Sequence, residues 1–251
     1  MARTVANEGK ATATYPTGAP PTAPCNAGAS IYHRNLMVSL LDRPPRATWW
    51  APRVRGWWIG VLFMIGSACF ALGAAPGYAT AVGARADGVT YFVGSLFFTS
   101  AAFLQFRESR PGSRLDRWAT SVQLVGTLFF NVSTAHALIT SWTAAQSDQK
   151  VWRPDALGSI CFLVASELAL IAVGKHWISW KPRVKDWWIA MLNMVGSIAF
   201  GVSAAASYVI VDSGVLRNAD RANAGTFVGA LCFFFGAVLL LPQPDSEDAQ
   251  P

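Results

Sequence analysis

One acidic residue, Glu167, lies inside a long apolar stretch of this chain, 156–174. It comes about ten residues after the start of the stretch, so its carboxyl group would lie near the centre of a bilayer that the stretch crosses. A carboxylate in hydrocarbon is costly and turns toward hydrogen-bond partners or water, or takes up a proton. The position of Glu167 therefore indicates proton or cation handling.

Polar residues on the preceding apolar stretch supply candidate partners for this acid. Gln123, Thr127 and Asn131 follow one another at intervals of four residues, which places them along one side of a helix. We therefore define a candidate ion site of Glu167 with Asn131, Thr127 and Gln123. Two interpretations remain open: Glu167 titrates during ion transfer, or a protonated Glu167 is hydrogen-bonded to the neighbouring helix and only holds the two helices together.

The sequence lacks the motifs of enzymes and metal sites. It has no P-loop, GxSxG or HExxH pattern, and its four cysteines form neither a CxxC pair nor a Cys/His metal spacing. We therefore expect no catalytic residues, no metal and no cofactor.

The composition indicates a membrane protein. Hydrophobic residues make up 53% of the 251 residues and charged residues only 14%, whereas roughly a quarter is charged in soluble proteins. The charges separate six apolar stretches, most of them long enough for a helix to cross the hydrocarbon layer. These stretches are 57–79, 91–106, 118–141, 156–174, 187–211 and 225–241.

The basic residues follow a topological pattern. Lys and Arg concentrate before the first apolar stretch and in the second and fourth connections, and they are few in the other three connections. By the positive-inside rule, this predicts that both termini are cytoplasmic. The net charge of +6 then indicates contact with anionic lipid headgroups at the cytoplasmic face and no nucleic-acid binding.

An internal duplication organises the apolar stretches. The segment PRVRGWWIGVLFMIGSACF at 52–70 returns as PRVKDWWIAMLNMVGSIAF at 182–200, with 11 of the 19 positions identical. A more diverged copy begins at Trp118 and aligns Gly126 with Gly66. The second stretch of each pair repeats too, as FVGSL, LGSIC and FVGAL. The predicted fold is therefore all-α, a polytopic membrane protein with six transmembrane helices in three parallel two-helix hairpin repeats.

Domain boundaries follow from these repeats. We expect close packing of the helices at the shared glycines and a belt of tryptophans at the cytoplasmic boundary. The polar first 48 residues, rich in Ala, Thr, Gly and Pro, read as a tail in which only 31–41 is apolar enough for an interfacial helix. The predicted parts are a disordered cytoplasmic tail at 1–48, hairpins at 49–110, 111–178 and 179–241, and an acidic cytoplasmic tail at 242–251.

The hairpins share a Trp-led first helix, a central phrase such as MIGSACF and a second helix that opens with a phrase such as FVGSLFF. In these features the chain resembles YrhK-like domains of bacterial membrane proteins. The resemblance covers 52–107 and 182–241 well and 114–175 weakly. It implies a small two-helix domain in a bacterial cytoplasmic membrane, and it brings no catalytic or ligand residues.

Two functions are compatible with the sequence. The favoured one is a non-enzymatic membrane scaffold or envelope-associated protein, which would assemble with itself or with another membrane protein. The alternative is a small transporter or channel for protons, cations or a small solute, centred on Glu167.

Overall fold

The computed structural model describes residues 50–109, 113–139, 141–174, 180–210 and 215–242. The tail predicted at 1–48, with its interfacial helix, lies outside the described residues, as does nearly all of the tail predicted at 242–251. The fold described below is that of the helical unit formed by residues 46–251.

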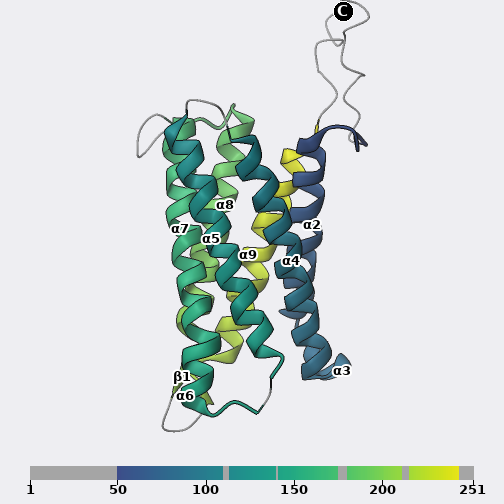
Figure 1. Cartoon of the computed structure of the whole chain (residues 1–251), viewed down its shortest axis with the longest axis vertical. Coiled ribbons are helices and arrows are strands. Elements are labelled where there is room, and N and C mark those ends of the chain that lie inside the picture. Colours follow the sequence, from purple (N-terminus) through teal and green to yellow (C-terminus); the bar gives the residue numbers. More distant parts are fainter. Residues whose placement is uncertain (1–49, 110–112, 140, 175–179, 211–214, 243–251) are drawn as a thin grey trace, which may run out of the picture. The chain divides into compact units, whose positions relative to one another are not determined.

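Long helices make up most of the described part of this unit (Figure 1). Six of them are long: α2 (Arg55–Gly73), α4 (Ala84–Glu108), α5 (Arg114–Ala137), α7 (Arg153–Gly174), α8 (Lys185–Ala206) and α9 (Ala219–Leu240). The short elements are α3 (Tyr78–Val82), α6 (Ala144–Ser147), the π-helical turn η1 (Asp148–Trp152) and the antiparallel two-residue strands β1 (Val209–Ile210) and β2 (Val215–Leu216).

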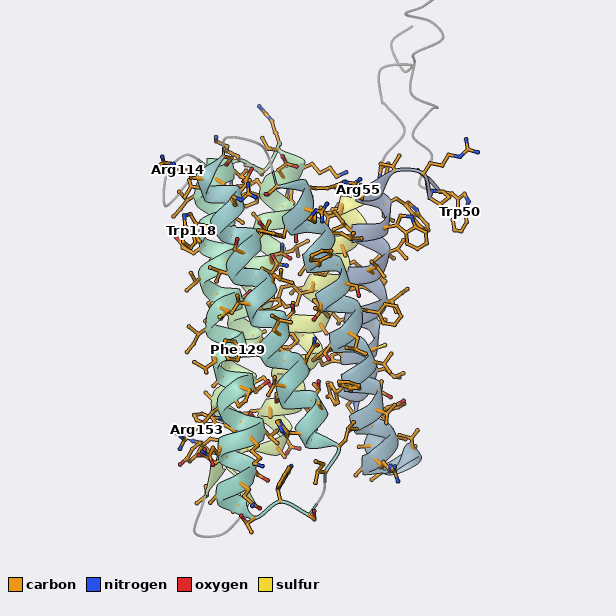
Figure 2. The ribbon with its side chains drawn as sticks, viewed as in Figure 1. Trp50, Arg55, Arg114, Trp118, Phe129 and Arg153 are labelled. Carbon is orange, nitrogen blue, oxygen red and sulfur yellow. The ribbon has the colours of Figure 1, made fainter. Side chains whose placement is uncertain are left out.

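The long helices form a closed ring. Each packs against two others, in the order α2, α4, α5, α7, α8, α9 and back to α2. Figure 2 shows Arg55 and Arg114, the first residues of α2 and α5, at one end of the bundle, and Arg153, the first residue of α7, toward the other end. Neighbouring helices in the ring therefore alternate in direction.

Five helices in the described residues are long and apolar enough to cross a membrane. They are α2, α4, the continuous helical segment Ala144–Gly174, α8 and α9. The structure thus confirms a helical protein suited to a membrane. α5 is not among the five, because polar residues such as Gln123, Thr127 and Asn131 lower its hydropathy.

The glycines shared by the hairpins are sites of close helix approach, as predicted. A Cβ atom on Gly229 of α9 would lie 2.9 Å from the carbonyl oxygen of Gly196 on α8 and 2.7 Å from Cε2 of Phe200. On α2, a Cβ atom on Gly66 would lie 2.7 Å from the ring of Phe98 and 3.0 Å from a backbone oxygen of α4. The absence of a side chain therefore lets each hairpin close around a phenylalanine ring.

The repeated PRV…WW segments fold in the same way. Trp58 Nε1 donates to the carbonyl oxygen of Pro52 at 2.8 Å, and Trp188 Nε1 donates to that of Pro182 at 2.8 Å. These bonds fix the chain that leads into α2 and into α8, which explains why the same residues recur. The first tryptophan of the α2 tandem, Trp57, is buried, so the predicted belt does not include every tryptophan at this end.

Several helix boundaries differ from the sequence prediction, and two of them have a clear local cause. α2 ends at Gly73 rather than at 79, because Pro76 cannot continue a helix and Gly77 is left-handed with φ +83°. α9 begins at Ala219 rather than at 225, because the Asn218 side chain accepts a hydrogen bond from the Arg221 backbone N–H at 2.9 Å and caps the helix.

Several acids outside the predicted apolar stretches lie in the first turns of helices. Asp87 is in the first turn of α4 and Asp155 is in the first turn of α7. A carboxylate is stabilised at a helix N-terminus by the helix dipole, which favours these starting points. Because α7 begins before Asp155, this residue belongs to the ring of helices and lies at the end of the ring where α7 begins.

Substituting Gly229 with alanine should destabilise the protein by roughly 1–3 kcal/mol, because the new methyl group overpacks the contact between α8 and α9. Thermal unfolding in detergent micelles measures the effect. Gly56→Ala is the matched control, since a Cβ atom there would meet nothing within 4 Å. Equal unfolding temperatures for the two variants would contradict the close approach.

Candidate functional site

Each long helix places one phenylalanine in the centre of the ring. Every one of these rings has 6% or less of its surface exposed, and together they form the core of the bundle. We call them the phenylalanine plug: Phe70, Phe98, Phe130, Phe162, Phe200 and Phe233.

The plug has a regular geometry. Phe70, Phe130 and Phe200, from α2, α5 and α8, form one triangle with ring centroids 5.8 to 6.4 Å apart. The three rings from α4, α7 and α9 form a second triangle, with centroids 5.6 to 6.3 Å apart. The void among the six rings is only about 10 Å³. Aromatic edge contacts of this kind close the axis of the ring to solutes.

A cavity of about 380 Å³ opens on one side of the plug, where α2, α5 and α8 begin. Its polar wall includes Gln105, Gln123 and Asn193, so we call it the amide vestibule. The same three amides line a small void of about 10 Å³ that lies directly against Phe98 and Phe233.

These amides have no hydrogen-bond partner among the residues that the structure describes, and Gln105 Oε1 is buried there. Polar groups inside proteins are normally hydrogen-bonded, and each exception calls for an explanation. Their position on the axis fits an interaction with water or with a solute. Side chains this polar would have no advantage in a purely apolar core.

Acids line the wider part of the amide vestibule. They are Glu108 of α4, Asp116 of α5 and Asp186 of α8. Glu108 Oε1 lies 3.6 Å from Nε of Arg55, and both side chains are partly exposed. Acids therefore line this entrance, and Arg55 partly offsets the charge of Glu108.

A second cavity, of about 540 Å³, lies on the opposite side of the plug, where α2, α5 and α8 end. Its wall includes Tyr91, Ser133, Asp155 and Thr226, so we call it the aspartate vestibule. Ser133 Oγ donates to a backbone carbonyl of η1 at 2.9 Å, and Thr226 Oγ1 is hydrogen-bonded to Ser203 Oγ at 2.7 Å. Asp155 receives no hydrogen bond or ion pair from the described residues.

The structure separates the residues of the predicted site. Gln123 lines the amide vestibule. Thr127 is fully buried, and its hydroxyl donates to the Leu124 carbonyl at 2.7 Å. Asn131 Nδ2 donates to Thr99 Oγ1 on α4 at 2.8 Å. Four residues turn a helix by about 40° more than one full turn. Gln123, Thr127 and Asn131 therefore point in successively different directions and do not face one common partner.

Glu167 is half-buried and lines none of the cavities described above. It follows Ile160 by seven residues and Val164 by three, and both of these side chains are exposed on the outer face of α7. Within the described residues Glu167 has no hydrogen bond or ion pair, so it does not join Asn131, Thr127 and Gln123 in a common site.

Sequence reasoning missed the plug and Asp155. The signal for the plug was present, because glycine followed four residues later by phenylalanine occurs at least once in every long helix. The signal for Asp155 was its register: it precedes Gly158 by three residues, as Tyr91 precedes Gly94.

Replacing Asn131 with leucine should cost about 0.6 kcal/mol of stability, the average for a hydrogen bond between membrane helices. Thr99→Val should cost a similar amount, and the double variant should cost no more than either one if the two side chains act as a pair. Unfolding titrations in micelles measure these differences. Strictly additive losses would argue against the pairing.

The comparisons with known proteins find no match to this chain: no family model, no curated protein and no solved structure is similar to it.

Proposed function

We propose that this protein is a transporter or channel whose passage for protons or small cations runs along the axis of the helix ring. All six long helices, α5 included, then span the membrane as three parallel hairpins, with both termini cytoplasmic. The amide vestibule faces the cytoplasm in this orientation. Residence in a bacterial cytoplasmic membrane and membership of the YrhK-like domains are parts of the same proposal, and both rest on the sequence resemblance.

One observation carries the proposal: two cavities, each with polar side chains on its wall, open toward opposite ends of the ring and are separated by a single apolar layer. Most outward-facing side chains of α7 are apolar, among them Leu157, Ile160 and Val164, and Glu167 is the exception. Polarity therefore increases from the lipid side toward the axis, as expected for a water-filled route closed by a hydrophobic constriction.

The preference for cations follows from the charges on the walls. Glu108, Asp116 and Asp186 line one cavity and Asp155 lines the other, while no Lys or Arg of the described residues lines either cavity. Clefts with walls of one sign concentrate ions of the opposite sign.

The structure fits the closed state of such a passage. The six rings of the plug leave about 10 Å³, at the lower limit for a single water molecule. Conduction requires the rings to turn aside or the hairpins to separate slightly. Flux of K⁺ or H⁺ into proteoliposomes tests the proposal, and flux no greater than through protein-free vesicles would overturn it.

Replacing Glu167 with glutamine should change this flux by less than about twofold, because the side chain lies outside both vestibules. The assay is the same proteoliposome measurement, with the amount of folded protein determined by gel filtration. Loss of flux in a normally folded Glu167→Gln protein would contradict this prediction and would indicate that Glu167 is part of the ion site.

The second candidate is a membrane scaffold, favoured by the close packing of the plug. Six aromatic rings in mutual contact form a rigid centre that suits a purely structural bundle. This function predicts no flux in any variant and a stable complex with a membrane partner. The unpartnered amides on the axis favour the passage instead.

A further inference from the structure

The aspartate vestibule has the size of a small-molecule site. Its volume of about 540 Å³ falls within the range of cavities that bind ligands. It is larger than a proton or a bare metal ion requires. The described residues also contain no group of three or more His, Cys, Asp or Glu side chains able to hold a metal ion.

A carboxyl group on the wall of this cavity has no basic partner among the described residues, and a second one lies nearby. Asp155 lines the cavity, and Asp87 lies one helical turn before Tyr91 on α4. Tyr91 and Asp155 line the same cavity. Asp87 Oδ1 is buried and has no hydrogen-bond partner in the described part of the chain.

Two basic side chains near this cavity, Arg153 and Lys150, are engaged elsewhere. Arg153 contacts Asp148 with its guanidinium, at 3.0 and 3.1 Å. Lys150 places its ammonium 4.0 Å from the ring centroid of Trp142. Neither of these cations pairs with Asp155 in the described structure.

Aromatic rings complete the cavity. Tyr91, Trp142 and Trp152 all line it. The indole N–H groups of the two tryptophans donate to the backbone carbonyls of His136 and Ala204, so they do not require a ligand as hydrogen-bond acceptor. Lys150 places its ammonium group on the face of Trp142, a contact of the kind that an aromatic wall offers to a cation.

We propose that the aspartate vestibule binds an organic ammonium ion, with Asp155 as its counter-ion and the rings of Tyr91 and Trp152 against its apolar part. A carboxylate provides the charge-assisted contact and the aromatic walls bury the carbon skeleton. The role of this ion as transported cargo rests on the proposed function, whereas the binding itself does not.

The test uses benzylammonium as the probe, benzyl alcohol as its neutral counterpart, and the purified full chain in detergent. Isothermal titration calorimetry should give benzylammonium an affinity at least about tenfold higher than that of benzyl alcohol. Asp155→Asn should weaken benzylammonium binding by at least about tenfold and leave benzyl alcohol unchanged. Asp220→Asn is the control, because Asp220 is an exposed acid near the start of α9 at the same end.

Equal binding of the two probes, or unchanged benzylammonium binding in Asp155→Asn, would overturn the proposal. If Asp155→Asn fails to fold, Trp152→Leu gives a second test, since loss of this ring should weaken benzylammonium binding while folding is checked by thermal unfolding. Binding that depends on Asp155 but is accompanied by no flux supports the site and refutes the transport function. Flux with no ammonium binding refutes the site alone.

Discussion

Replacing Phe233 with alanine should raise cation flux through the protein by at least about tenfold, because it removes one of the six rings that close the axis. Phe233 contacts Phe98, Phe162 and Phe200, with centroids 5.5 to 5.9 Å away. Its loss leaves a gap that joins the two vestibules. Ion flux into proteoliposomes, compared at equal amounts of folded protein, measures the effect.

Phe235→Ala is the matched control for this variant. Phe235 is on the same helix, but 55% of its surface is exposed on the outer face. The same truncation there should leave flux unchanged. Burial predicts that Phe233→Ala also lowers stability, by about 3–5 kcal/mol, so both proteins must be shown to remain folded after reconstitution. Equal flux in the two folded variants would contradict a gate at the plug.

The double variant Gln123→Leu with Asn193→Leu should reduce cation flux by about tenfold, because it removes polar groups from the narrow end of the amide vestibule. An ion that leaves bulk water needs oxygen ligands or retained water along its route. Leucine supplies neither and makes the apolar layer longer. The measurement is flux through the wild-type and double-variant proteins at several ion concentrations.

Asn131→Leu is the control for the amide variants. It removes an amide from α5 as well, but Asn131 is bonded to Thr99 and lines neither vestibule. It should lower stability slightly and leave flux unchanged. A loss of flux in Asn131→Leu as large as in the double variant would mean that the amides act through packing.

The helices themselves could be predicted from sequence, because the repeated segments contain their own folding signals. The sequence repeat shows that Trp58 and Trp188 occupy equivalent positions, and the structure adds that they make the same bond to the chain before their helix. The end of α2 was misplaced because apolar residues continue past Gly73, and apolarity alone does not register the break at Pro76 and Gly77.

The site was only partly predictable. Gln123 was identified as polar on an apolar helix, and it does line the axis. Glu167 was singled out because it lies near the middle of an apolar stretch. That position indicates its depth in the membrane but does not determine which face of α7 it occupies. Asp155 was overlooked because charge near the end of an apolar stretch reads as a connection. Which helix faces meet depends on the closure of the ring, and this arises from contacts between distant segments such as α2 and α9.

The most direct test is the water accessibility of the two vestibules, measured with a membrane-impermeant thiol reagent on Asn193→Cys, Thr226→Cys and Ile198→Cys. Asn193 and Thr226 line opposite vestibules, whereas 51% of Ile198 is exposed on the outer face of α8. Labelling of the wild-type protein corrects for the native cysteines. The passage predicts that Asn193→Cys reacts only from the cytoplasmic side, Thr226→Cys only from the opposite side, and Ile198→Cys from neither. If neither Asn193→Cys nor Thr226→Cys reacts from either side, the result would contradict a passage and would support a purely structural helix bundle.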